Sequence, residues 1–256
     1  MTDWQPQEYL RFCDERTRAA RDLLSQVPLA RADVIYDLGC GPGNSTSLLV
    51  ERFPGARITG VDNSPAMLAQ ARRDCPQADY QDADLSQWSP DEQPSLLFSN
   101  ATFQWVPDHV QVLARLARSL KPGGVMAVQM PDNLREPSHR LIQAVAEEGA
   151  WAGKLAKASS ARDPLPEPRE YYRRLKQLFS RLDIWHTVYN HVLQGPAGIV
   201  QWISSTGLRP YLNSLAEDER QHFISAYQAR LADAYPAMDD GMVLLRFPRL
   251  FIVGVR

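Results

Sequence analysis

The sequence predicts an α/β protein with a mostly parallel β-sheet, helices on both faces of that sheet, and a helical cap. Three observations support this fold class. Short β-type runs alternate with helical stretches over residues 34–130, a glycine-rich turn follows the first run, and the second half of the chain is mainly helical. Strands that alternate with helices form parallel sheets covered on both faces. A chain of 256 residues, 44% of them hydrophobic, can bury one substantial core, so we expect a single domain over residues 1–256.

The first half of the chain starts with a helix and continues as the alternating pattern. Apolar residues recur at helical spacing over residues 8–24, which predicts an N-terminal helix. Pro122, Gly123 and Gly124 mark the end of a helix, because proline and glycine stop helices and start turns. The expected elements of the core, which we place at residues 33–130, are strands at 34–37, 57–61, near 80, 96–99 and 125–129, and helices at 45–52, 66–72 and 110–120.

The second half predicts helices between two further strands. Residues 133–180 are mostly of helical type, interrupted by a proline-rich loop at 163–168. We expect a strand at 183–192, helices at 197–205 and 217–235, and an antiparallel closing strand at 244–255, bent at Pro248. The helical segments at 133–180 and 196–240 are expected to form a cap over the edge of the sheet and to contribute the acceptor site.

The composition excludes several classes of protein. Lys and Arg number 28 against 30 Asp and Glu, so the net charge of −2 gives no electrostatic footprint for nucleic acid. The longest apolar runs, such as 250–255, are too short to cross a bilayer, and the first residues lack the pattern of a signal peptide. Three cysteines without a C-x-x-C pair are expected to be free thiols. We therefore expect a cytoplasmic protein with no nucleic-acid or membrane partner, and no obligate protein partner is implied.

A glycine-rich loop, Asp37-Leu38-Gly39-Cys40-Gly41-Pro42-Gly43-Asn44, directly follows the first β-run and opens a helix. Glycines let the chain turn sharply and let a ligand approach the backbone. The plain alternative is a tight turn without a ligand. Asp62 stands about twenty residues further on, at the end of the second β-run, where a carboxylate accepts hydrogen bonds from a ribose. The glycine-rich loop and Asp62 together favour a ligand that contains a nucleoside.

The spacing of the loop separates two such ligands. A dinucleotide-binding dehydrogenase has the pattern G-x-G-x-x-G, whereas here the third glycine comes one residue early and Asn44 takes its place. Pro42 also removes a backbone N–H where a pyrophosphate needs donors. A nucleoside with an amino-acid tail and no phosphate suits the loop better, and S-adenosylmethionine is such a ligand.

Further residues suit the same ligand. Asp84 lies just past the third β-run, where a carboxylate accepts from an adenine amino group, and Met67 is placed to pack against the ring. Asn100 ends the fourth β-run at the carboxyl edge of the sheet, the usual ligand site in open α/β sheets, and Trp105 follows it closely. Each of these residues, taken singly, also suits an ordinary turn, cap or core role.

The order D-L-G-C-G-P-G, then G-V-D, then an acidic residue, then S-N-A, then L-K-P-G-G resembles the class I methyltransferases over roughly residues 34–130. The resemblance implies a Rossmann-like sheet. It also implies that the glycine loop and Asn100 lie near the methionine tail of S-adenosylmethionine, Asp62 at the ribose and Asp84 with Leu85 at the adenine. The candidate cofactor-binding residues are Gly39, Gly41, Asn44, Asp62, Asn63, Met67, Asp84, Leu85 and Asn100.

Four flanking blocks resemble a narrower family. They are D-W-Q-P near the N-terminus, Q-M-P-D-N with E-P-S-H after residue 128, T-G-L-R-P-Y-L after residue 205, and F-P-R-L-F-I-V near the C-terminus. Together they resemble the trans-aconitate 2-methyltransferase family over nearly the whole chain. The resemblance implies a bacterial, cytoplasmic enzyme that transfers a methyl group from S-adenosylmethionine to a carboxylate, giving a monomethyl ester and S-adenosylhomocysteine.

A tricarboxylate acceptor requires cations that hold it. Carboxylates with pKa values of roughly 4 are ionised near neutral pH, so attack on the methyl group needs no general base, and no catalytic residue is expected. Guanidinium groups bind carboxylates in bidentate fashion, although an arginine is often simply solvated or ion-paired. Trp105 and Tyr9 are candidates to wall the site and exclude water. The candidate acceptor-binding arginines are Arg209 first, then Arg246, Arg249 and Arg16.

Other functions stay open from the sequence alone. The acceptor is trans-aconitate or another small metabolite, and a cofactor-binding protein that has lost catalysis or a dehydrogenase are the alternatives from other classes. The histidines lack the spacing of a metal site, so no metal is expected.

Overall fold

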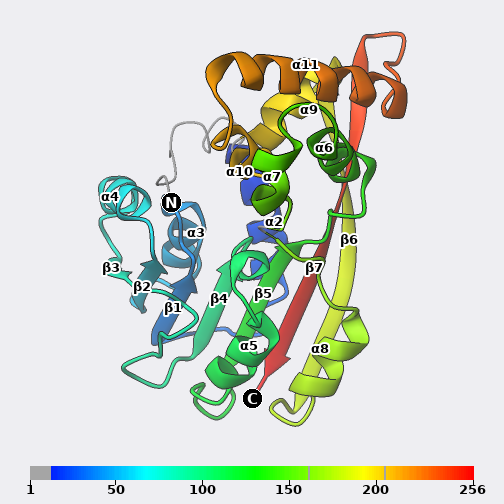
Figure 1. Ribbon diagram of the computed structural model, residues 1–256. Helices are drawn as coiled ribbons and strands as arrows, with labels where there is room; N and C mark the ends of the chain where they lie inside the picture. The colour runs from blue at the N-terminus through cyan, green and yellow to red at the C-terminus, as the bar shows by residue number, and fades with distance from the viewer. Residues whose placement is uncertain (1–12, 161, 205) are drawn as a thin grey trace.

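The computed structural model of the protein describes residues 13–160, 162–204 and 206–256. One seven-stranded sheet in the order β3-β2-β1-β4-β5-β7-β6 forms its centre (Figure 1). The five strands β1 to β5 are parallel, and β7 is antiparallel to both β5 and β6. The strands are β1 (Val34–Leu38), β2 (Arg57–Asp62), β3 (Asp79–Asp82), β4 (Leu96–Asn100), β5 (Val125–Pro131), β6 (Arg181–Gln194) and β7 (Met242–Val255).

Helices cover both faces of the sheet. Helices α2 and α3 cover one face of the sheet, and the hydrophobic core on this face extends to α6, α7, α9, α10 and α11 at one end of the molecule. Helices α5 and α8 cover the other face. Helix α4 contacts β2 and β3 at the edge of the sheet. The helices are α2 (Cys13–Ser25), α3 (Asn44–Arg52), α4 (Pro65–Asp74), η1 (Phe103–Trp105), α5 (His109–Ala117), α6 (Pro137–Glu147), α7 (Ala152–Ser159), α8 (Pro168–Leu175), α9 (Gly195–Ser204), α10 (Arg209–Leu212) and α11 (Glu217–Ala234).

The central strands are buried on both sides, and their side chains alternate between two cores. In β1, Ile35 packs into the core beneath α2 and α3, whereas Tyr36 packs into the core beneath α5. Leu96 and Leu97 in β4 divide in the same way. This period of two, in runs that are apolar throughout, is typical of a parallel sheet with helices on both faces.

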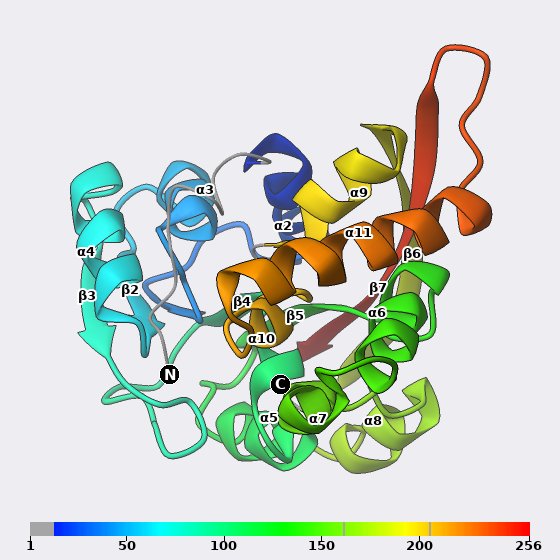
Figure 2. The ribbon, with the colours of Figure 1, turned by 45° about the horizontal axis from the view of Figure 1, so that its top comes forward.

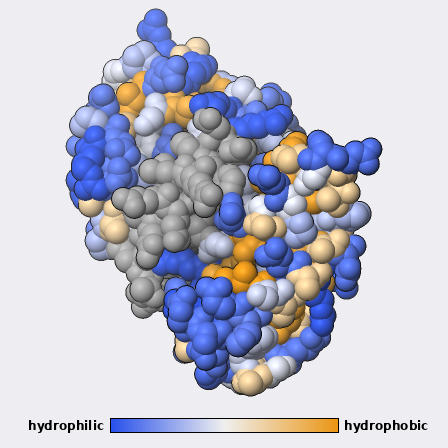
Figure 3. Space-filling view, turned by 90° about the horizontal axis from the view of Figure 1, so that it is seen from above, coloured by the Kyte–Doolittle hydropathy of each residue, from blue (hydrophilic) through white to orange (hydrophobic). Residues whose placement is uncertain are grey.

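The cap consists of α6, α7, α9, α10 and α11. Helix α11 packs on α6 and α9, and α7 contacts α6 and α10 (Figure 2). The carboxyl ends of the parallel strands point toward this cap in Figure 1. Seen from above, the described surface at this end is mainly hydrophilic, with apolar side chains exposed in smaller areas (Figure 3). The cap therefore stands over the sheet edge at which α/β proteins bind their ligands.

The predicted fold class is confirmed: the sheet is mostly parallel with an antiparallel closing strand. Several bounds differ. Helix α8 lies in a segment expected to belong to the cap, yet it packs on α5 and β6 because Tyr171 and Leu175 are buried on the sheet face. Strand β7 begins two residues earlier than expected and continues through Pro248, which pairs with Val188. The expected start of the N-terminal helix, residues 8–12, lies outside the described residues.

Candidate cofactor and acceptor sites

The glycine loop between β1 and α3 is held by a neighbouring strand. The N–H groups of Gly39 and Cys40 donate to the carbonyl oxygen of Val61, at 2.7 and 3.1 Å. Gly39 has a φ of +72°, and a Cβ there would lie 2.1 Å from two side-chain atoms of Thr102. Only glycine fits this position, because both the backbone conformation and the space exclude a side chain.

The next glycine of the loop binds Asp62. The Gly41 N–H donates to Asp62 Oδ2 at 2.9 Å, and the Ser64 N–H donates to Asp62 Oδ1 at 2.9 Å. A Cβ added at Gly41 would meet no atom of the described residues within 4 Å. The loop thus presents open space directly beside a carboxylate that is fixed in orientation at the end of β2.

Asp37 is a functional candidate that the sequence reasoning did not single out. It is fully buried in β1, and Ser45 and Thr46 each donate a hydroxyl to its Oδ2 at 2.7 Å. Its Oδ1 is buried and has no partner among the described groups. Burial raises the pKa of Asp37 to about 6, against the lowering effect of the two hydroxyls, and the charge of Asp62 raises it further. An acidic residue inside an otherwise apolar run was the available signal.

The residues expected at the adenine are spread over a strand end and a helix. Asp84 is exposed, and its Oδ1 accepts from the Ser86 N–H at 2.8 Å, which is a turn role. Leu85 and Met67 are 5% and 3% exposed. Asn63 is exposed beside Asp62, and Asn44 is the half-buried first residue of α3. Their expected contacts with the cofactor stay predictions.

The end of β4 is joined to the glycine loop. Thr102 Oγ1 donates to the carbonyl oxygen of Gly39 at 3.1 Å. Ala101, with a φ of +59°, has a left-handed backbone that residues other than glycine rarely adopt, and its N–H donates to the Gln129 carbonyl at 2.9 Å. The buried Oδ1 of Asn100 has no hydrogen-bond partner in the described part of the chain. This acceptor and the strained turn are consistent with a ligand site.

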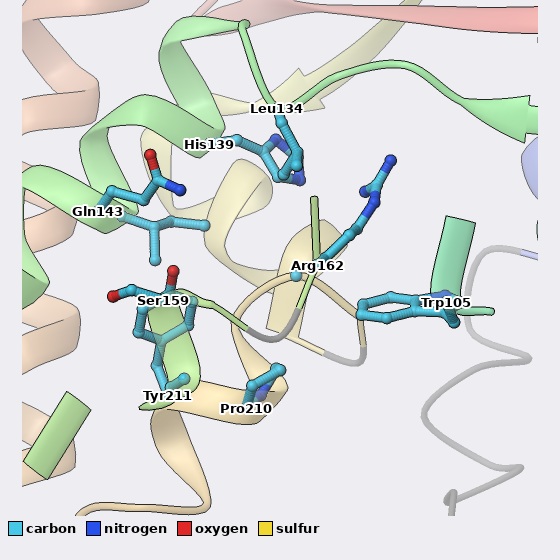
Figure 4. A pocket seen from close by; sticks show the side chains of 11 residues that line it. Trp105, Leu134, His139, Gln143, Ser159, Arg162, Pro210 and Tyr211 are labelled. Atoms are coloured by element: carbon cyan, nitrogen blue, oxygen red, sulfur yellow. The ribbon is translucent and has the colours of Figure 1, made fainter. Parts of the chain in front are cut away.

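Under the cap, a pocket lies next to the end of β4 (Figure 4). Arg162 extends between His139 and Trp105 in this view, and its guanidinium carbon lies 5.7 Å from the centroid of a Trp105 ring. Burial, together with the charge of Arg162, lowers the pKa of His139 to about 3, so that this imidazole is neutral. The pocket is lined by Trp105, Leu134, His139, Ile142, Gln143, Ala158, Ser159, Arg162, Gly207, Pro210 and Tyr211.

The predicted acceptor arginines occupy different environments. Arg249 is 4% exposed and donates to Gln129 Oε1 at 3.1 Å. Arg246 is exposed and forms an ion pair with Glu136. Arg209 is half-buried at the start of α10, just before two residues that line the pocket.

Two of the candidate acceptor residues belong to the N-terminal segment. Tyr9 lies outside the described residues. Arg16 falls in α2, but its side chain is likewise outside the described part. Neither Arg162, which lines the pocket, nor Gln129, which binds Arg249, was a candidate from the sequence: Gln129 belongs to the Q-M-P-D-N block without a role of its own, no motif surrounds Arg162, and only tertiary contacts bring the two near Arg249.

Two features are absent from residues 13–160, 162–204 and 206–256. No cluster of three or more His, Cys, Asp or Glu side chains suited to a metal ion occurs among them. None of the helices within that part of the chain combines the length and hydropathy that a membrane span requires.

Comparison with known proteins identifies the class. Residues 35–124, which include the glycine loop and Asp62, match the model of a methyltransferase domain. The YcgJ protein of Bacillus subtilis has a similar fold, with a TM-score of 0.60 over 93% of this chain and 98% of that one, at 12% identity. Phosphoethanolamine N-methyltransferase 2 of Haemonchus contortus, solved with S-adenosyl-L-methionine, aligns with a TM-score of 0.55 over 93% of this chain and 52% of that chain, at 18% identity. The chain has the fold of a class I methyltransferase.

Two curated relatives define the family. Trans-aconitate 2-methyltransferase of Rhodopseudomonas palustris (strain BisB5) is 54% identical over 256 residues, which is 100% of both chains. That of Agrobacterium fabrum (strain C58) is 51% identical over 253 residues, covering 99% of each. This chain belongs to the trans-aconitate 2-methyltransferase family.

Proposed function

We propose that this chain transfers a methyl group from S-adenosylmethionine to a carboxylate of trans-aconitate, giving the monomethyl ester and S-adenosylhomocysteine. The observation that carries the proposal is the 54% identity over the whole length of a relative named for this reaction. Because that identity spans the cap as well as the core, it extends to the segments expected to hold the acceptor.

The cofactor side of the proposal is supported by the residues at the glycine loop. Asp62 is held by two backbone N–H groups with open space at Gly41, which suits a ribose that donates hydroxyls. The buried Oδ1 of Asn100 and the buried carboxylate of Asp37 supply acceptors and negative charge where a cationic amino-acid tail would lie. S-adenosylmethionine supplies an activated methyl group when it is bound.

The reaction requires the protein to position the two reactants, and it requires no proton transfer. A carboxylate oxygen attacks the methyl carbon, the new O–CH₃ bond forms as the S–CH₃ bond breaks, and the electron pair passes to sulfur, which becomes a neutral thioether. No proton moves, because the acceptor is already ionised near neutral pH. Holding both reactants in line is a large rate effect by itself. We therefore assign the residues of this site to binding and to exclusion of water.

Arg209, Arg249 and Trp105 remain candidates for holding the acceptor, and the structure supports them to different degrees. Arg249 is buried at the carboxyl edge of the sheet and Trp105 lines the pocket. Arg246 has an acidic partner at the surface, which makes it the weaker candidate. We further infer that the enzyme works in the cytoplasm on a small tricarboxylate, without a nucleic-acid, membrane or obligate protein partner.

The direct test is incubation with methyl-labelled S-adenosylmethionine and trans-aconitate, followed by mass spectrometry of the small-molecule products. A labelled monomethyl ester is the expected result. A panel of other small acceptors, assayed by release of S-adenosylhomocysteine, tests the alternative acceptor. Cofactor binding without transfer to any carboxylate, together with methylation of a neutral phenol or amine, would overturn the proposal.

A further inference from the structure

Polar side chains from three neighbouring strands gather at the carboxyl edge of the sheet. Asn100 and Gln129 are paired residues of β4 and β5. Arg249 in β7 donates to the Gln129 carboxamide oxygen at 3.1 Å. Along each strand, these three positions fall on the face that packs against α2 and the cap helices. The apolar core on this face therefore ends in a polar cluster directly below the cap.

Arg162 reaches the same place from the loop that precedes α8. Its Nη1 donates to Asn133 Oδ1 at 3.0 Å, and its Nη2 donates to the carbonyl oxygen of Pro131, the residue paired with Arg249. These partners carry no charge. Burial lowers the pKa of Arg162 to about 10; the nearby negative charge of Asp132 raises it, and the positive charge of Arg249 lowers it. Two guanidinium groups are thus held close together in a largely buried environment.

Two donors in this cluster have nothing to bind within the described structure. Arg162 Nε and Gln129 Nε2 are both buried without a hydrogen-bond partner in that part of the chain. The side chain of Gln129 is fully buried, and its orientation follows from the bond that Arg249 makes to its oxygen. Buried donors of this kind are normally satisfied, so they indicate a missing acceptor. A carboxylate is an acceptor only and matches both.

The pocket beside these donors has the electrostatics of an anion site. Among the described residues, its lining includes one cation, Arg162, and no Asp or Glu; the carboxylate whose charge acts on Arg162, Asp132, lies outside this lining. His139 is held neutral by burial and by Arg162, so it neither adds positive charge nor competes for the guanidinium. Trp105 lies against the Arg162 guanidinium and directly follows the strand that ends in Asn100. The anion would therefore lie next to the glycine loop, where methyl transfer is proposed.

We propose that Arg162 and Arg249, together with the Gln129 carboxamide, bind the carboxylates of the acceptor that are not methylated. Arg162 is then a specificity-determining residue that selects polycarboxylates over acids with a single carboxylate. This inference rests on the proposed function. The inference goes beyond the proposed function because it assigns the acceptor site to Arg162 and Gln129, to which the sequence motifs gave no role.

The test compares wild type, Arg162→Gln and Arg162→Lys, with Arg140→Lys as the matched control because Arg140 is an exposed arginine on α6. The acceptors are trans-aconitate, the related butenedioate with two carboxylates, and butenoate with one. We expect Arg162→Gln to lower kcat/KM for trans-aconitate about tenfold or more, mainly through KM, while butenoate turnover is unchanged. Arg162→Lys should retain part of the preference for polycarboxylates, since the ammonium group keeps the positive charge but cannot bind a carboxylate in the bidentate way of a guanidinium group.

A second measurement does not depend on turnover. Calorimetric titration of trans-aconitate into protein saturated with S-adenosylhomocysteine should give weaker binding for both Arg162 variants, and the affinity for S-adenosylhomocysteine should stay within about twofold of wild type. Gln129→Leu should weaken trans-aconitate binding in the same assay if the Arg162 variants prove unstable.

The outcomes separate the two proposals. Wild-type activity on trans-aconitate with equal losses for all three acceptors in Arg162→Gln, or with no loss at all, would overturn the inference and leave the proposed function standing. Wild type that methylates no carboxylate would overturn the proposed function itself. Equal weakening of cofactor and acceptor binding would show that Arg162 has a structural role only.

Discussion

Replacing Asp37 by Asn should stabilise the protein at neutral pH and leave its stability nearly unchanged in acid. Burial raises the pKa of Asp37 from 3.8 to about 6 in the folded protein. Between these two values the folded state binds more protons than the unfolded state, so the free energy of unfolding falls as the pH rises through this window. The difference of about 2 pKa units corresponds to about 3 kcal/mol. Asparagine does not titrate, and its carboxamide oxygen still accepts from Ser45 and Thr46.

Urea unfolding followed by tryptophan fluorescence at about pH 4 and about pH 7 measures this effect. The difference in unfolding free energy between Asp37→Asn and wild type should increase in favour of the variant by roughly 2–3 kcal/mol between the two pH values. Asp91→Asn is the control, since Asp91 is an exposed carboxylate, and it should show no such change. A difference that does not vary with pH would refute the reasoning, because a constant offset reflects altered packing and not the buried charge.

The same substitution should weaken S-adenosylmethionine binding. Above pH 6 the Asp37 carboxylate is mainly ionised, and its negative charge at the glycine loop favours a ligand that carries a sulfonium and an ammonium group. Calorimetry at about pH 8 should show lower affinity for Asp37→Asn, and wild-type affinity should decline below about pH 6 as the carboxyl gains a proton. Equal affinity of the two proteins at alkaline pH would mean that this charge does not act on the cofactor.

Four further substitutions test other parts of the site. Gly39→Ala should lower the free energy of unfolding by about 2–5 kcal/mol, because Gly39 has a φ of +72° and a Cβ there would lie 2.1 Å from Thr102. Gly41→Ala should lower it by only about 1 kcal/mol, because a Cβ there meets none of the described residues. Equal losses in urea unfolding would contradict the steric argument. Asp62→Ala should weaken S-adenosylmethionine binding by about 1–3 kcal/mol in calorimetry, since it removes a charged acceptor, and unchanged affinity would contradict the ribose assignment. Arg209→Lys should raise KM for trans-aconitate far more than it changes cofactor affinity, and parallel losses of both would indicate a structural role.

The part of the fold that carries the cofactor loop is predictable because its signals are local. Glycines 39, 41 and 43 stand at alternate positions of one loop and all have a positive φ, so a short run of sequence specifies the turn. Asp62 follows an apolar β-run, and β2 does end at that residue. The turn at the glycines and the end of the strand at Asp62 are local features, which a sequence presents directly, whereas the contacts of the loop with Val61 and Thr102 appear only in the structure.

Other features depend on packing that a single segment does not reveal. The sequence predicts that the segment of α8 belongs to the cap, because the helical stretches lie between sheet elements, but its buried Tyr171 stacks on His109 of α5 and fixes the helix to the sheet face. In the sequence, Asp37 is simply the first residue of the glycine motif. Only its burial in the structure shows that its negative charge lowers the stability of the folded protein. Gln129 stands in a strand buried at every position, and the sequence shows it only as part of the Q-M-P-D-N block; that its side chain binds Arg249 follows from the packing of β5 beside β7.

The two halves of the site are built in different ways, and this has a physical consequence. The cofactor half consists of the loops after β1, β2 and β4, joined to one another by backbone hydrogen bonds and by Thr102. The proposed acceptor half consists of Gln129, Arg162 and Arg249, which come from β5, the loop before α8 and the closing strand; Arg249 donates to the Gln129 side chain and Arg162 donates to the Pro131 carbonyl oxygen. A substitution in the second set leaves the backbone that holds the cofactor intact. Acceptor specificity is therefore able to change without loss of cofactor binding, as expected of a fold on which one cofactor site serves many acceptors.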